Sequence, residues 1–394
     1  MIRKIIGVSA FLICLSILTL SYVNTYAQET PFELESPSAL LTDFDTGTIL
    51  FEKNPNEKLP LASITKVMTT LLALEAIDNG RIKLEDEVHV SEYAASMGGS
   101  QVFLEAGEIL PVSAILKAII VSSGNDASVA IAEKIAGTVE TFVVQMNDRA
   151  AELGMKNTAF ADCTGLSDEG NYSTAYDISI MSRELLKHPL FFKWSTIWLD
   201  NLKEAKNNTE LTNTNRLVRF YEGCDGIKTG STQKAKYCLT ASSKRGDLRL
   251  ISVVLASPSS QIRFQETAKL MDFGYANYEA VPLINKDDLV ERQVKVMGGK
   301  DRIISGLAGK NYTALSRKGR DEQYDTENII DQPIKAPIKK GDKIGHILVK
   351  KDGVEIGTVA ILADRDIDTA SIFDYIKKVI REWTSSTEKE EVLN

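Results

Sequence analysis

The clearest chemical pair in this sequence is a serine and a lysine three positions apart, Ser63 and Lys66. Side chains three residues apart lie on the same face of a helix, so these two can meet. In a pocket that holds another cation, the pKa of a lysine falls, and its neutral amine can take the proton from a hydroxyl. The pair therefore predicts Ser63 as a nucleophile and Lys66 as its base, with backbone N–H groups at the helix start to stabilise an oxyanion.

The element that must position this pair is a helix within residues 59–77. Ser63 stands at an N-cap or first-turn position, and apolar side chains follow at helical spacing. A capping box would place Glu or Gln at position 66, and a lysine there is unfavourable at the positive end of the helix dipole. Ser-x-x-Lys also begins at Ser231 and Ser386, but only Ser63 begins an apolar helix. On its own, the segment remains open to interpretation as an ordinary helix start.

A second candidate group is Ser123-Gly124-Asn125. It separates two apolar segments that predict helices, residues 112–121 and 127–135. A hydroxyl and a carboxamide on a rigid helix–helix turn can face a pocket, where Ser123 would relay a proton to a leaving nitrogen and Asn125 would bond both Lys66 and a substrate amide. The alternative is purely structural: Gly124 ends one helix, and Asn125 or Asp126 caps the next.

A third candidate group, Lys228-Thr229-Gly230, ends a predicted strand. A lysine and a hydroxyl together can bind a carboxylate, and a glycine lets a substrate backbone approach closely. The backbone N–H of Ser231 would be a second oxyanion donor beside that of Ser63. A solvated lysine before a turn is the structural alternative for this group.

The strand pattern predicts one antiparallel sheet covered by helices. A hairpin with the turn Asp45-Thr46-Gly47 precedes the Ser63 helix, and three strands with short connections come much later, so the hairpin should form one edge of the sheet. The five strands are residues 39–43, 48–53, 223–229, 237–242 and 248–256. Residues 68–195 are mostly helical and form a subdomain, and residues 261–278 form a closing helix. This arrangement is an α+β fold with an antiparallel five-stranded sheet.

After residue 281 the sequence predicts a small all-β domain and then one terminal helix. The strands of this domain are residues 290–297, 312–316, 343–350 and 354–363. The helix, residues 369–383, is amphipathic, and its apolar stripe comprises Ile372, Phe373, Ile376, Val379, Ile380 and Trp383. It either packs on the β-domain or lies in the outer face of the cytoplasmic membrane, with basic residues beside anionic lipid.

The N-terminal sequence has a pattern which predicts that the protein is exported. Arg3 and Lys4 precede the apolar run 5–20, and small residues follow at 25–27, which is the arrangement of a signal peptide. An uncleaved membrane anchor is the alternative.

Charge and residue counts argue against several other kinds of site. The formal charge of −8, without a basic patch, argues against nucleic acid as a partner. The three histidines lack metal-ligand spacing, and the chain has no P-loop and no Gly-x-Ser-x-Gly motif, so neither a metal nor an organic cofactor is expected. Cys163, Cys224 and Cys238 make an odd set, in which the last two either pair or remain buried thiols on neighbouring strands.

Taken in this order, the three groups resemble the motifs of the penicillin-binding proteins and serine β-lactamases: Ser63-Ile64-Thr65-Lys66, Ser123-Gly124-Asn125 and Lys228-Thr229-Gly230. The surrounding stretches TDFDTGTILFEKNPNEKLPLASITK, GLSDEGNYSTAYD and GCDGIKTGSTQKAKYCLTAS are similar to the low-molecular-mass D-alanyl-D-alanine carboxypeptidases. The resemblance covers about residues 35–280. Gly124 fits the carboxypeptidase branch, whereas many other members have Asp there.

The resemblance implies an exported serine carboxypeptidase that removes the terminal D-alanine from peptidoglycan stem pentapeptides and is acylated by β-lactam antibiotics. The implied catalytic residues are Ser63, Lys66, Ser123 and Asn125, and the implied substrate-binding residues are Lys228, Thr229, Gly230 and Ser231. It also implies a division of the chain into a signal peptide (1–27), a catalytic domain (28–280), a β-domain (281–366) and a membrane-associating helix with a polar tail (367–394).

An endopeptidase, a β-lactamase and a non-catalytic peptidoglycan-binding scaffold are the alternative functions. Class A β-lactamases use a glutamate to activate the deacylating water. In the corresponding region, NTAFADCTGLSDEG, this sequence has Asp162, Asp168 and Glu169 but no Glu-x-x-Leu-Asn. A non-catalytic scaffold would have no need of an intact Ser63-x-x-Lys66 pair.

Overall fold

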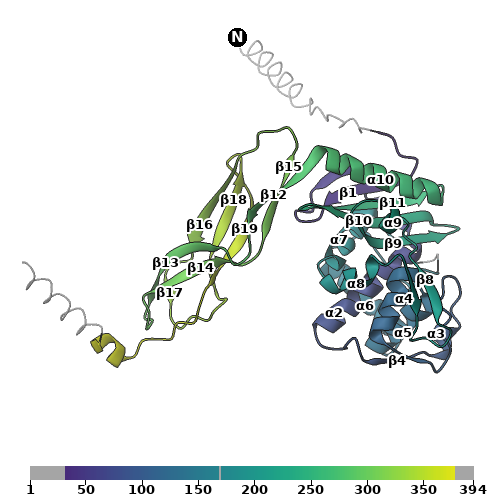
Figure 1. The fold of residues 1–394 in the computed structure, drawn as a ribbon, viewed down its shortest axis with the longest axis horizontal. Coiled ribbons are helices and arrows are strands. Elements are labelled where there is room, and N and C mark those ends of the chain that lie inside the picture. Colours follow the sequence, from purple (N-terminus) through teal and green to yellow (C-terminus); the bar gives the residue numbers. More distant parts are fainter. Residues whose placement is uncertain (1–31, 168–169, 378–394) are drawn as a thin grey trace, which may run out of the picture. The chain divides into compact units, whose positions relative to one another are not determined.

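The structure, a computed structural model, describes residues 32–167 and 170–377. Its central element is an antiparallel sheet with the strand order β2-β1-β11-β10-β9 (Figure 1). The strands are β1 (Ser38–Asp43), β2 (Ile49–Lys53), β9 (Cys224–Thr232), β10 (Lys236–Arg245) and β11 (Leu248–Ser257). The predicted α+β fold and its N-terminal edge hairpin are therefore confirmed.

Helices cover both faces of this sheet, which explains the continuous apolar runs of its inner strands. The helix α10 (Ser260–Asn277) packs on β11, β10 and β1, and α7 (Ala175–Leu185) contacts the same three strands. Figure 1 shows these two helices on opposite faces. All six residues of β1 are buried, and β11 is buried at eight consecutive positions. The sheet is thus the middle layer of the domain.

The helical region lies between β2 and β9 in sequence and carries two of the three candidate groups. Besides α7, its longer helices are α2 (Lys66–Asp78), α4 (Val112–Ser122), α5 (Asn125–Ala136) and α6 (Val139–Glu152). Its shorter helices are η1 (Ala62–Thr65), α3 (Glu92–Ala95), η2 (Pro189–Phe191), α8 (Phe192–Ser195) and α9 (Leu217–Phe220). Small two-stranded ladders connect them: β3 (Leu59–Pro60) with β6 (Tyr172–Ser173), β4 (Glu87–His89) with β5 (Ile109–Pro111), and β7 (Leu199–Leu202) with β8 (Thr209–Thr212).

The C-terminal region is an all-β domain with twice as many strands as the sequence pattern revealed. They are β12 (Tyr278–Ile284), β13 (Leu289–Met297), β14 (Ile303–Ala308), β15 (Tyr312–Arg317), β16 (Tyr324–Ile330), β17 (Ile334–Lys335), β18 (Lys343–Lys351) and β19 (Val354–Ala363). Six of them form a sheet in the order β16-β18-β19-β14-β13-β17, and β12 pairs with β15. Side chains of these strands, mainly isoleucines and valines, form a separate small core.

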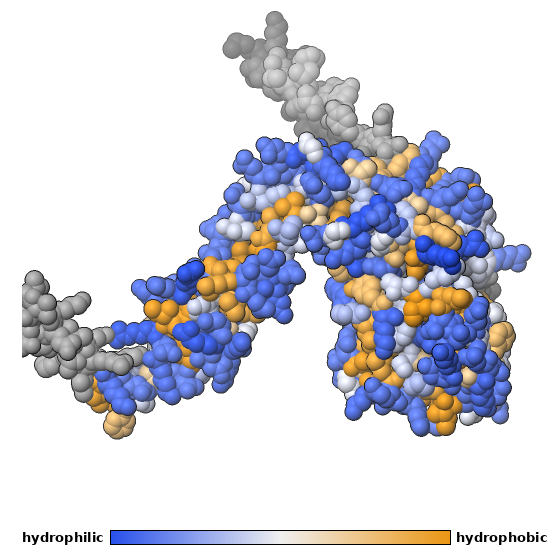
Figure 2. Space-filling model, viewed as in Figure 1, coloured by the Kyte–Doolittle hydropathy of each residue, from blue (hydrophilic) through white to orange (hydrophobic). Residues whose placement is uncertain are grey.

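The predicted terminal helix is described only in its first part, residues 372–377. There Ile372 is 78% exposed and Phe373 is 75% exposed, so these two side chains do not pack on the β-domain, whereas Tyr375 lines a pocket with Val296 and Ile303. Figure 2 shows hydrophobic side chains on the surface at this end of the described chain. Val379, Ile380 and Trp383 lie outside the described residues, as does the predicted signal peptide.

Cys163, Cys224 and Cys238 are all buried and unpaired, so the alternative of buried thiols on neighbouring strands is the correct one. Within residues 32–167 and 170–377, no helix has both the length and the apolar character needed to span a bilayer.

Candidate active site

Ser63 lies in a 3₁₀ turn that leads directly into the first long helix. The turn is η1, and α2 begins at Lys66. No side chain caps either segment, so Ser63 occupies the first turn but not an N-cap. The preceding residue, Ala62, has a φ of 47°, a strained conformation for a residue with a Cβ. The Ser63 hydroxyl makes no capping hydrogen bond to the helix backbone and contacts Lys66 instead.

Lys66 connects the first two candidate groups. Its Nζ donates to Ser63 Oγ at 3.0 Å, to Asn125 Oδ1 at 2.6 Å and to the carbonyl oxygen of Thr164 at 2.7 Å. The side chain is fully buried, and this burial lowers the pKa of Lys66 to about 7. The main cause is therefore loss of solvent rather than the second cation that the sequence argument invoked. A substantial fraction of Lys66 is neutral near pH 7 and can accept a proton.

The Ser123-Gly124-Asn125 turn differs from the purely structural interpretation. Ser123, not Gly124, takes the left-handed conformation that ends α4, with φ 64° and ψ 32°, whereas Gly124 has a φ of −56°. The buried Ser123 hydroxyl has no hydrogen-bond partner among the described residues. Asn125 donates from Nδ2 to the carbonyl of Gly98 at 2.6 Å, which fixes the amide so that Oδ1 faces Lys66. A strained serine with an unused hydroxyl is typical of a functional position.

The Lys228-Thr229 pair lies on β9 and is buried, so the interpretation of Lys228 as a solvated lysine is wrong. Lys228 is 4% exposed, and its Nζ donates to the carbonyl of Thr229 at 3.0 Å. Thr229 Oγ1 donates to Thr214 Oγ1 at 2.8 Å. Burial, followed by the charges of Lys66 and Arg263, holds the pKa of Lys228 well below its ordinary value. A buried cation repelled by two others favours the binding of an anion beside it.

The structure gives another reason for a glycine at position 230 than the expected approach of a substrate backbone. A Cβ at this position would lie 2.9 Å from the carbonyl oxygen of Leu61 and 3.2 Å from Cβ of Ala62. The missing side chain therefore lets β9 approach η1, the turn that carries Ser63. Ser231, the next residue, is exposed. The structure thus brings the third candidate group beside the first.

Sequence reasoning missed the contribution of Asp162 and Thr164. The Asp162 carboxylate accepts hydrogen bonds from the backbone N–H groups of Thr164 (2.7 Å), Gly165 (2.5 Å) and Ser167 (3.2 Å), and from Asn171 Nδ2 (2.7 Å). These bonds fix the loop whose Thr164 carbonyl contacts Lys66. The Asp-x-Thr-Gly pattern indicates such a side-chain-to-backbone turn, but no local signal connects it to Lys66. Asp168 and Glu169 lie outside the described residues.

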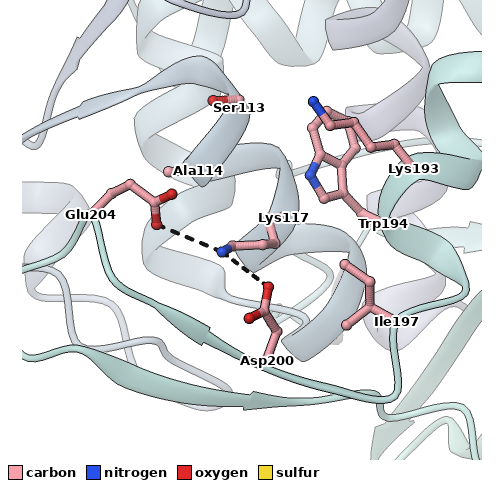
Figure 3. Close-up of a pocket in the computed structure, with 8 residues that line it drawn as sticks. All are labelled: Ser113, Ala114, Lys117, Lys193, Trp194, Ile197, Asp200 and Glu204. Carbon is pink, nitrogen blue, oxygen red and sulfur yellow. Dashed lines mark hydrogen bonds and ion pairs between the residues drawn. The ribbon is translucent and has the colours of Figure 1, made fainter.

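A pocket elsewhere in the same domain contains none of the predicted site residues. It has a volume of about 280 Å³, and its charges are paired internally: Lys117 of α4 contacts Asp200 at 3.2 Å and Glu204 at 3.6 Å (Figure 3). Lys193 lies over the ring of Trp194 at 5.3 Å from its centroid. The ion pairs fasten the β7–β8 hairpin to α4, the helix that ends at Ser123. The pocket therefore belongs to the packing around α4 and not to the predicted site.

Comparisons with known proteins agree with the motifs. The family described as D-alanyl-D-alanine carboxypeptidase matches residues 24–259, and the penicillin-binding protein 5 C-terminal domain matches residues 278–369. The D-alanyl-D-alanine carboxypeptidase DacF of Bacillus subtilis is 45% identical over 355 residues, which cover 89% of this chain and 90% of the relative.

Solved structures give the same result. Penicillin-binding protein 5 from Haemophilus influenzae is 31% identical with a TM-score of 0.70, covering 86% of this chain and 99% of that one. Penicillin-binding protein D2 from Listeria monocytogenes in its ampicillin-bound form is 30% identical with a TM-score of 0.54, covering 62% of this chain and 99% of that one. The resemblance found in the sequence is confirmed, and the chain belongs to the D-alanyl-D-alanine carboxypeptidase family.

Proposed function

We propose that this protein removes the terminal D-alanine from peptidoglycan stem pentapeptides through an acyl-enzyme on Ser63. The observation that carries the proposal is the 3.0 Å contact between Ser63 Oγ and Lys66 Nζ, in which the lysine is buried and has a pKa of about 7. A hydroxyl beside an amine that is partly neutral at physiological pH is an activated nucleophile.

The proposed reaction assigns a role to each candidate residue. Lys228 and Thr229 bind the terminal carboxylate of the peptide. Ser63 Oγ attacks the carbonyl carbon between the last two D-alanines while Lys66 takes its proton. The backbone N–H groups of Ser63 and Ser231 stabilise the oxyanion.

The tetrahedral intermediate then breaks down to an acyl-enzyme, which water hydrolyses in a second stage. The C–N bond breaks as Ser123 passes a proton from Lys66 to the leaving nitrogen, and free D-alanine departs. Asn125 holds Lys66 and the substrate amide during this transfer. Water then adds to the ester on Ser63, which releases the shortened peptide and regenerates the hydroxyl.

β-Lactam antibiotics would acylate the same serine. This part of the proposal is supported by the Listeria monocytogenes relative, whose solved forms are described as ampicillin-bound and cefotaxime-bound. A β-lactam ring opens on attack by the serine, and the opened ring stays attached. Slow hydrolysis of that ester would make the drug an inhibitor.

Export and membrane attachment are part of the same proposal. The substrate lies outside the cytoplasm, which fits the predicted signal peptide in residues 1–27. At the other end, the exposure of Ile372 and Phe373 supports an interfacial helix rather than one packed on the β-domain. The protein would then act at the outer face of the cytoplasmic membrane.

Product analysis tests the activity against its alternatives. The protein is incubated with a pentapeptide ending in D-Ala-D-Ala and, separately, with a D-alanyl cross-linked dimer. We expect that the pentapeptide releases free D-alanine and that the cross-linked dimer stays intact. Cleavage of the dimer alone would favour an endopeptidase. Rapid turnover of penicillin would indicate a β-lactamase, and no labelling by a fluorescent penicillin would indicate a scaffold.

A further inference from the structure

Arg263, on α10, is a buried cation that the proposed reaction does not use. It is 8% exposed, and burial lowers its pKa to about 10. Its Nη1 donates to the carbonyl of Gly230 at 3.0 Å and to the carbonyl of Cys238 at 3.3 Å, and its Nη2 donates to Ser260 Oγ at 3.3 Å. The guanidinium thus bridges β9 and β10 at the register position where Gly230 faces Cys238.

The absence of an acidic partner distinguishes Arg263 from an ordinary structural arginine. Among the residues that the structure describes, no carboxylate lies within ion-pair distance of it. Arg149, which joins helices of the same domain, pairs with Glu75 at 2.8 Å and Glu152 at 3.0 Å. The guanidinium of Arg263 lies over the rings of Phe264 and Tyr237, at 4.7 Å and 5.6 Å from their centroids, and burying a cation among neutral groups without a carboxylate is unfavourable. Because burying an unpaired cation lowers stability, an arginine at this position is more readily explained by function than by stability.

The carbonyl that Arg263 binds belongs to a peptide unit with a proposed role in the reaction. In a trans peptide the C=O and N–H point in opposite directions, so holding the Gly230 carbonyl also directs the N–H of Ser231. Glycine restrains its own peptide poorly, and Gly230 cannot gain a side chain because of its approach to Leu61. A charge-assisted bond to the carbonyl fixes the plane and makes the N–H a stronger donor.

We propose that Arg263 is a positioning residue for acyl transfer, because its bond to the Gly230 carbonyl holds the Ser231 N–H in place as an oxyanion donor. The inference rests on the proposed function, in which Ser63 is the nucleophile. The alternative is a role in substrate binding, in which the positive charge of Arg263, close to that of Lys228, would attract the substrate carboxylate. The two roles predict different kinetics.

The test compares Arg263→Gln and Arg263→Lys with the matched control Arg149→Gln. For each, the binding constant and the first-order acylation rate constant are measured with benzylpenicillin and with an acylating thioester that has no carboxylate, together with the thermal midpoint. Arg263→Gln should slow acylation by about 10- to 100-fold for both reagents, somewhat less than removal of an oxyanion donor itself. Binding should change little. The acylation rate of Arg263→Lys should fall between those of the wild type and Arg263→Gln, because an ammonium lacks the rigid planar group that directs Nη1 to both carbonyls and Nη2 to Ser260.

Arg149→Gln should lower the thermal midpoint without slowing acylation. Unchanged acylation in a folded Arg263→Gln would overturn the inference, as would a loss confined to the carboxylate-bearing reagent. If Arg263→Gln does not fold, wild-type rates in Arg263→Lys would overturn it instead. A wild-type protein that takes no label on Ser63 would overturn the proposed function itself. If the wild type is labelled normally and the Arg263 variants are acylated as fast as the wild type, only the role of Arg263 is overturned.

Discussion

Two lysines of the catalytic domain and two of the C-terminal β-domain lie in opposite environments. Lys66 and Lys228 are buried in the catalytic domain and make no ion pair within the described residues, whereas Lys350 and Lys351 of the β-domain pair with Glu327 at 2.6 Å and Glu322 at 2.7 Å. Pairs near a protein surface contribute at most about 1 kcal/mol. Buried, unpaired lysines lower stability. Burial of Lys66 and Lys228 therefore lowers the stability of the catalytic domain but keeps two reactive amines out of ion pairs, whereas Lys350 and Lys351 carry no such cost.

The largest effect should come from changing the buried base. Lys66→Arg keeps the positive charge but cannot become neutral, because arginine stays protonated at physiological pH. Acylation by penicillin should slow by about 100-fold or more. The matched change in the β-domain, Lys350→Arg, should leave the rate unchanged. Stopped-flow measurement of both variants makes the comparison, and near-normal acylation by Lys66→Arg would show that another group is the base.

The pH dependence of the acylation rate is a second test of Lys66 as the base. Burial lowers the pKa of Lys66 to about 7, and the neutral amine is the form that accepts a proton. Acylation should therefore rise as the pH increases through about 7 and then level off. The first-order rate constant measured between pH 5 and pH 9 checks this. A rate that stayed constant over that range, or fell as the pH rose, would contradict the assignment.

A smaller effect is expected for the second buried lysine. Lys228→Gln removes the charge that receives the substrate carboxylate, and a hydrogen bond to a charged group contributes about 1.5–3 kcal/mol. Binding of peptides with a free C-terminus should weaken by about 10- to 100-fold. Peptide amides should bind as before, and Lys351→Gln should change neither. Equal weakening for acids and amides would mean that Lys228 acts on the structure of the strand.

The smallest effect on catalysis should come from removing the terminal segment. Ile367 is buried in the β-domain, Thr369 bridges to Gly299 and the Ala370 N–H donates to Gly298, so the chain is best ended after Ala370. The truncated protein should acylate normally but no longer sediment with anionic liposomes. Phe373→Glu in the full chain should weaken liposome binding too. If the full-length and truncated proteins sediment equally, the anchor proposal fails.

The two domains also differed in how well the sequence revealed them. Strands such as β11 are buried on both faces, so their apolar runs were visible, and the five-stranded sheet was predicted correctly. In the β-domain, β16 is exposed at five consecutive positions and therefore has no apolar pattern, and β12 continues directly from α10 without a turn. The predicted closing helix accordingly extended one residue too far, to Tyr278.

At the site, side chains were easier to predict than backbone contacts. Ser63, Asn125 and Lys228 belong to short motifs with chemical meaning. The Thr164 carbonyl and the bond from Arg263 to Gly230 are contacts of backbone groups with residues far away in sequence, and no local pattern encodes them. The cause of the Lys66 pKa was also misjudged, because complete burial is a property of the fold rather than of the motif.

The most direct test of the account is to locate the covalent adduct. The protein is treated with penicillin, digested and analysed by tandem mass spectrometry, alongside Ser63→Ala. If Ser63 is the nucleophile, the wild type should carry one penicilloyl group on the peptide that contains Ser63, and a folded Ser63→Ala variant should carry no adduct. An adduct on another residue, or persistent labelling of the alanine variant, would contradict this assignment.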